Sequence, residues 1–144
     1  MTGLARVQRW GLVGLCVIWL GGGVAEQVAA RQTPALASLQ EALASGDAHL
    51  LMAEASDRVE IALLGQSKLY SRAQAVYVMQ DFFRRYPPEH FAFQNTSQAE
   101  GSWFATGQYR YKHAERPLKV YVRLRMKGAQ WELREVRIEQ RRRS

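Results

Sequence analysis

The ten residues from 118 to 127 constrain the fold more than any other part of the sequence, because apolar side chains alternate there with charged side chains or tyrosine. Side chains of a β-strand point alternately to opposite faces, so this pattern predicts a strand with one buried and one exposed face. The residues that follow, Lys127-Gly128-Ala129-Gln130, fit a two-residue turn of type II′ with glycine first. The region therefore predicts an antiparallel pair of strands over 118–127 and 130–140.

The apolar pattern of the last strand predicts a bend in this sheet. In the hairpin register, apolar residues lie opposite apolar residues as far as Leu133. Beyond that point the apolar positions shift by one residue, to Val136 and Ile138. A β-bulge near residues 134–135 restores the pairing and sets Val136 opposite Val122. Because bulges bend strands, we expect a strongly curved sheet.

The sequence before residue 118 predicts helices first and strands later. Thr33-Pro34 is typical of a helix start and Ser45-Gly46 of a helix end. Ser71 and Gln74 have the spacing of a capping box, and Pro87-Pro88 ends the helix that follows. The expected elements are a helix over 34–45, a short helix capped by Asp47 that runs to residue 55, a strand over 59–63, a helix over 71–86, and strands over 91–97 and 102–111.

Residues 1–30 have the composition of a secretory signal peptide. Arg6 and Arg9 precede an uncharged apolar core that ends at three glycines. This core is shorter than the ~20 apolar residues of a spanning helix. Small residues then offer cleavage after Ala25 or Ala30. We therefore expect export to the periplasm or the medium, with no spanning segment after cleavage; an uncleaved N-terminal anchor is the alternative.

Most of the net charge of +7 lies outside the predicted domain. Residues 31–140 carry 15 basic and 12 acidic side chains, whereas a basic tail over 141–144 adds three arginines. The single cysteine, Cys16, lies in the predicted signal, which excludes a disulfide framework and a thiolate zinc cluster. The 47% hydrophobic content excludes a disordered chain. We expect one domain over 33–140 and, because of export, no nucleic-acid partner.

Several short motifs carry a resemblance to a known family: Ala44-Ser45-Gly46-Asp47, Tyr70-Ser71-Arg72-Ala73-Gln74-Ala75, Gln80-Asp81-Phe82-Phe83, Tyr86-Pro87-Pro88 with Phe91, and Trp131-x-Leu133 followed by Val136-x-Ile138. With these motifs, residues 36–140 resemble domain-of-unknown-function family 4783, small exported bacterial proteins. That family is similar to the nuclear-transport-factor-like superfamily, with its ketosteroid-isomerase-like and SnoaL-like members. The resemblance implies a cone-shaped α+β fold, with two to three N-terminal helices packed on a curved antiparallel sheet. It implies no established activity.

The inward face of the predicted sheet carries no carboxylate and no imidazole. Enzymes of the resembled superfamily place such a group in the cone, where burial raises the pKa of a carboxyl group. The three histidines are scattered, so we expect no metal site and no cofactor. We expect an apolar pocket for a small molecule, lined by Tyr77, Phe83, Trp103, Tyr109, Tyr111 and Trp131.

The outward face of the sheet predicts an interaction surface. Its candidate residues are Phe104, Tyr121, Arg123 and Arg125. Glu132 is expected opposite Arg125, which partly neutralises the basic stripe. In the resembled superfamily this face is a common dimer surface, so we expect a homodimer formed through it.

These observations favour an exported, non-enzymatic module that binds a small ligand or another protein. One alternative is an isomerase- or cyclase-like enzyme, in which Tyr109 or Tyr111 donates a hydrogen bond to a bound carbonyl. That enzyme needs an acid or base from Asp81, Glu60 or His90. A further alternative is adhesion to anionic envelope surfaces through the basic outward face and the tail.

Overall fold

The computed structural model describes residues 33–142 of the chain. The predicted signal peptide over 1–30 lies outside these residues, as do the last two residues of the basic tail. The elements are the helices α2 (Pro34–Ser45), α3 (Ala48–Ala53) and α4 (Arg72–Arg85), and the strands β1 (Ala55–Leu63), β2 (Gln66–Ser71), β3 (Pro88–Ala99), β4 (Ser102–Tyr111), β5 (Leu118–Lys127) and β6 (Gln130–Gln140). None of these helices is long and apolar enough to cross a membrane.

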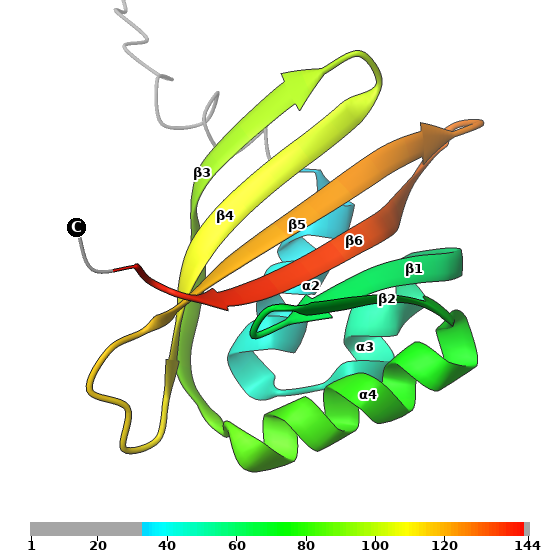
Figure 1. The fold of residues 1–144 in the computed structure, drawn as a ribbon. Helices are drawn as coiled ribbons and strands as arrows, with labels where there is room; N and C mark the ends of the chain where they lie inside the picture. The colour runs from blue at the N-terminus through cyan, green and yellow to red at the C-terminus, as the bar shows by residue number, and fades with distance from the viewer. Residues whose placement is uncertain (1–32, 143–144) are drawn as a thin grey trace, which may run out of the picture. The chain divides into compact units, whose positions relative to one another are not determined.

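The strands form one six-stranded curved sheet in the order β2-β1-β6-β5-β4-β3, and the helices pack on one side of it (Figure 1). We call the side that the helices cover the inner face and the opposite side the outer face. Neighbouring strands are antiparallel except β1 and β6, which are parallel. The α+β cone-like fold is therefore confirmed, with a mixed sheet where the sequence predicted an antiparallel one.

The predicted register of the last hairpin is confirmed. Leu124 lies opposite Leu133 and Val122 lies opposite Val136, so Arg134 is the extra residue of a bulge. Gly128, the first residue of the turn, has a φ of 60°. Only local pairing rules were needed for this prediction, because both strands follow one another directly in the chain.

A second bulge, which the sequence analysis did not predict, bends β3 at Gln94, between the pairs that Phe93 and Asn95 make with β4. The neighbouring Gly107 allows the close approach of the two strands. A Cβ atom there would lie 2.4 Å from the carbonyl oxygen of Ala92. The close approach of β3 and β4 at this bulge therefore depends on a glycine in an otherwise regular strand.

The helix ends carry the capping residues that the sequence predicted. Backbone N–H groups donate to the side chains of Thr33 (3.2 Å), Asp47 (2.9 Å) and Ser71 (3.2 Å) at the starts of α2, α3 and α4. The backbone N–H of Ser71 also donates to Gln74 Oε1 at 3.1 Å, which completes the capping box. Gly46 ends α2 with a φ of 72°.

The strand β2 is absent from the sequence prediction. It is exposed over most of its length, so its sequence lacks the alternation of a half-buried strand. It pairs with β1 through a tight turn in which Leu64 and Gly65 both have positive φ. Leucine is an unusual residue for that conformation, so the turn has no sequence signal either.

Candidate functional site

Five of the six side chains predicted to line an apolar pocket lie in the core or pack against it. Phe83 and Tyr109 are buried in the core, and Trp103, Tyr111 and Trp131 are partly buried against it. The ring of Tyr109 lies 5.5 Å from that of Phe82 and 6.4 Å from that of Phe83 between centroids.

Tyr77 points away from the interior, with 73% of its surface exposed. The buried residues of α4 are Ala75, Met79, Phe82 and Phe83. An α-helix turns by about 100° per residue, so Tyr77 lies about 200° from Ala75 around the helix. It borders two surface hollows beside α4, in contrast to its predicted place in the cone.

Tyr109 has a structural partner for its hydroxyl group. The hydroxyl donates a hydrogen bond to the carbonyl oxygen of Tyr86. Burial raises the pKa of Tyr109 well above its usual value of 10. The hydroxyl is therefore neutral and occupied, and it is not directed at space that a ligand carbonyl would fill.

The three predicted acid–base candidates lie at the surface. Asp81 makes ion pairs with Arg84 and Arg85, and the hydrogen bond from Arg85 is the main cause that lowers its pKa. Glu60 accepts a hydrogen bond from Ser67 at 2.6 Å, and His90 is exposed. Among residues 33–142, the only buried polar or charged residues are Ser56 and Glu135, and no group of His, Cys, Asp or Glu there could hold a metal ion.

The outer face carries the predicted aromatic and basic residues. The ring of Phe104 lies 6.1 Å from that of Tyr121, and the guanidinium of Arg137 lies 5.8 Å from the Tyr121 centroid. Arg123 and Arg137 contact the nearly buried carboxylate of Glu135 at 3.4 Å and 2.6 Å.

Much of the basic stripe is therefore neutralised within the chain. Arg125 lies opposite Glu132, as predicted. Burial and the nearby charge of Glu135 raise the pKa of Tyr121. A dimer formed through this face stays a prediction.

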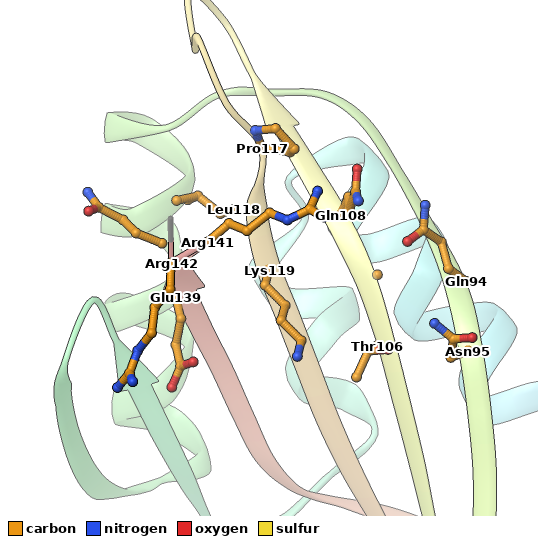
Figure 2. Close-up of a pocket in the computed structure, with 12 residues that line it drawn as sticks. Gln94, Asn95, Thr106, Gln108, Pro117, Leu118, Lys119, Glu139, Arg141 and Arg142 are labelled. Carbon is orange, nitrogen blue, oxygen red and sulfur yellow. The ribbon is translucent and has the colours of Figure 1, made fainter. Parts of the chain in front are cut away.

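A polar hollow of about 420 Å³ lies on the outer face at the end of the sheet where β6 ends (Figure 2). We call it the polar hollow. The side chains of its lining that can donate or accept hydrogen bonds come from four strands and the chain end: Gln94, Asn95, Thr106, Gln108, Lys119, Glu139, Gln140, Arg141 and Arg142. Figure 2 shows the side chain of Arg141 extending from the end of β6 toward Gln108.

The strand register builds the polar hollow from two rows of side chains. Lys119 on β5 lies directly opposite Gln108 on β4 and Glu139 on β6. Asn95 and Thr106 are paired in the next row. Directly opposite residues have Cβ atoms about 5 Å apart, so one small ligand can contact both rows.

The chemistry of this lining suits a ligand with hydroxyl groups and a negative charge. Amide and hydroxyl side chains both donate and accept hydrogen bonds. Lys119, Arg141 and Arg142 add three positive charges against the single carboxylate of Glu139. Sequence reasoning assigned Lys119 to the outward face and the arginines to a tail, but it did not bring them together with the amide residues.

Comparison with known proteins agrees with this fold. The family described as "Domain of unknown function (DUF4783)" matches residues 36–139. The chain belongs to this family. No curated protein matches the sequence.

Solved structures of DUF4783 proteins share the fold at low sequence identity. The Bacteroides ovatus protein is 20% identical with a TM-score of 0.68, over 74% of this chain and 96% of that one. The Bacteroides uniformis protein is 17% identical with a TM-score of 0.70, over 78% and 100% of the two chains. An NTF2-like protein of unknown function from Shewanella oneidensis is 11% identical with a TM-score of 0.54, over 74% and 93%. These similarities show that this chain has an NTF2-like fold.

Proposed function

We propose that this DUF4783 protein is an exported, non-enzymatic binding module that holds an acidic, polyhydroxylated ligand, such as a saccharide containing uronic acid, in the polar hollow. The observation that carries the proposal is the gathering of five amide or hydroxyl side chains and three cations around one hollow of about 420 Å³. Ligand sites commonly have volumes of about 300–1,000 Å³, so the hollow fits one or a few sugar rings.

The apolar character of the buried residues supports a binding role over catalysis. Enzymatic acid–base chemistry needs a titratable group within hydrogen-bond reach of the substrate. Among the described residues, the one buried carboxylate, Glu135, lies on the outer face, no imidazole is buried, and the hydroxyl of Tyr109 already donates to the carbonyl oxygen of Tyr86. Recognition by exposed polar side chains needs no such group.

The predicted adhesion to acidic envelope surfaces is consistent with the same site. Two arginines of the predicted basic tail, Arg141 and Arg142, border the polar hollow together with Lys119. A uronic acid carboxylate can accept charge-assisted hydrogen bonds from these groups. The tail and the outer face then contribute to one binding site.

Calorimetric titration tests the ligand class. The full sequence is expressed, the product is purified, and trigalacturonate is compared with the neutral trisaccharide maltotriose. We expect trigalacturonate to bind at least tenfold more tightly, with an affinity that falls as salt screens the charges. Lys119→Gln should weaken trigalacturonate binding severalfold, whereas Lys68→Gln, which removes an exposed lysine from β2, should leave it unchanged. Equal binding of both sugars, or equal effects of both variants, would refute the proposal.

Export is tested on the same product. Mass spectrometry of protein from the periplasm or medium should show a chain that starts at residue 26 or 31. An intact Met1 on protein that remains in the cytoplasm would contradict export without affecting the ligand test.

A second candidate ligand is apolar, as the sequence predicted, and the tryptophan pair favours it. The rings of Trp103 and Trp131 pack edge to face 6.2 Å apart, and Met126, which lies opposite Trp131, is 42% exposed. After signal cleavage these are the only two of the four tryptophans that remain. Addition of an apolar probe such as dodecanol should therefore change the intrinsic fluorescence, and Trp131→Leu should abolish the change. A spectrum that dodecanol leaves unchanged would exclude this candidate.

A further inference from the structure

The two edges of the sheet differ in how they are protected. An edge strand presents unpaired backbone N–H and C=O groups, which can pair with a strand of another chain. Natural proteins block such edges with lysine, proline, bulges or a covering element. The edge strands here are β2 and β3.

The edge at β2 is protected. The strand has six residues and carries Lys68, whose ammonium group lies 5.4 Å from the centroid of the Tyr70 ring. A second copy that paired with this edge about an axis at Lys68 would set two lysines opposite each other. Such a contact is unfavourable, because like charges across a strand pair repel.

The first half of β3 is also covered. The backbone N–H of Phe93 donates to Gln40 Oε1 on α2 at 3.0 Å. This bond shows that α2 satisfies the edge at Phe93. The bulge at Gln94 follows directly.

Beyond the bulge, Asn95 to Ala99 has no such protection among the described residues. Its five residues are all exposed, and none is charged or a proline. Figure 1 shows this end of β3 at a corner of the sheet, away from α4. We call this segment the open edge.

We propose that the open edge pairs with the same segment of a second copy of this chain, in an antiparallel manner, about a two-fold axis at Thr96. In a two-fold contact, the same segment of the two copies pairs with itself in reverse order. The segment must therefore be complementary to itself. An axis perpendicular to the sheet at Thr96 sets Thr96 opposite Thr96 and Asn95 opposite Ser97. Every one of these pairs is neutral and can form a side-chain hydrogen bond, which stabilises cross-strand pairs.

The contact is small, so the dimer is reversible. Stable interfaces bury about 1,200–2,000 Å² in total, and a pair of short strands buries less. We therefore expect a dimer whose population rises with protein concentration. The perpendicular axis keeps the outer faces of both copies on the same side of one continuous sheet, so, if the proposed function holds, the two polar hollows face the same way.

A cysteine scan tests the pairing directly. In the full chain with Cys16→Ser, the substitution Thr96→Cys introduces a single cysteine at the proposed axis. Opposite residues of an antiparallel pair have Cα atoms about 4.5–5.5 Å apart, within the range that a disulfide spans. Mild oxidation should therefore give a covalent dimer, at a yield at least tenfold above that of the matched control Gln66→Cys on β2. Equal yields from the two variants would overturn the proposal.

Sedimentation equilibrium separates this dimer from the alternatives. Thr96→Lys places two lysines together at the axis and should lower the association constant at least tenfold, whereas Gln66→Lys should not change it. Circular dichroism checks that both variants remain folded. A chain that is monomeric up to millimolar concentration would overturn the proposal. So would a dimer that Arg125→Glu on the outer face dissociates and Thr96→Lys does not, because that dimer forms through the outer face. Both experiments are independent of the ligand.

Discussion

The inner and outer faces of the same sheet are held by different interactions. On the inner face of β5, Val120 and Val122 are completely buried under the helices. On its outer face, Tyr121 and Arg123 belong to a network of ion pairs and aromatic contacts around Glu135. Adjacent residues of one strand thus serve apolar packing on one side and polar contacts on the other.

This difference separates stability from recognition. Apolar burial supplies the main favourable free energy of folding, so the inner face has little freedom to change. The outer face needs only to keep its polar groups paired, which leaves the polar hollow free for a ligand. The following predictions, from the largest effect to the smallest, test this division.

Two tyrosines on opposite faces provide the strongest test. Tyr109→Ala removes a fully buried ring and should lower the free energy of unfolding by about 4 kcal/mol. Tyr121→Ala removes a partly exposed ring from the outer face and should cost about 1 kcal/mol. Urea unfolding followed by circular dichroism measures both values. Equal losses would mean that the outer face contributes to stability as the inner face does.

Gly107→Ala tests the close approach of β3 and β4. The new Cβ would meet the Ala92 carbonyl oxygen and the Phe91 ring, which lies 2.8 Å away. We expect a loss of about 3 kcal/mol, because backbone has to move to relieve the contact. Thr106→Ala, one residue earlier on the outer face, is the control and should cost less than about 1 kcal/mol. An unchanged stability of Gly107→Ala would show that the bend at the bulge is adjustable.

Glu135→Gln tests the nearly buried carboxylate of the outer face. Its side chain is 9% exposed and contacts both Arg123 and Arg137. Loss of its charge should destabilise the fold by about 2 kcal/mol, since hydrogen bonds to charged groups contribute more than neutral ones. The control Glu139→Gln removes a carboxylate that is half exposed, and its effect in the same unfolding assay should stay below about 0.5 kcal/mol. A stable Glu135→Gln protein would show that the network is not needed for folding.

Asp81→Asn gives the smallest effect, and its sign depends on pH. The hydrogen bond from Arg85 and the charges of both arginines lower the pKa of Asp81 in the folded state below its usual 3.8. The folded state therefore binds a proton less readily than the unfolded state, so this stabilisation is present above the unfolded pKa and is lost as the pH falls through the folded pKa. The stability difference between the original protein and Asp81→Asn should shrink on acidification from about pH 5 to about pH 2. A difference that grows in acid would contradict this assignment.

Local rules explain which parts of the fold could be predicted. The capping residues Thr33, Asp47 and Ser71 act on backbone groups two or three residues away, so their effect is visible in the sequence. The bulge at Arg134 was predicted because a shift in apolar phase marks it. The bulge at Gln94 lies in a polar, exposed stretch, where no alternation of apolar and polar residues could reveal a shift. The parallel pairing of β1 with β6 joins segments that are far apart in the chain, so no local rule predicts it.

The candidate site was harder to predict than the fold. Interior residues such as Tyr109 were identified by alternation, but their contacts with Phe82 and Phe83 join a strand to a helix that is distant in the sequence. Tyr77 was assigned to the pocket although its position on α4 faces solvent. The members of the polar hollow are common surface residues, and only the strand register and the path of the chain end bring Gln94 near Arg141.

The sequence by itself determined the family, the order of most elements and the face of each residue in β4, β5 and β6, because helix caps, turns and side-chain alternation are local properties. The tertiary structure decided the properties that depend on distant segments: the aromatic contacts between α4 and β4, a polar hollow built from four strands, and one open edge on β3. These follow from sheet order and strand register, since hydrogen bonds between strands set which residues become neighbours.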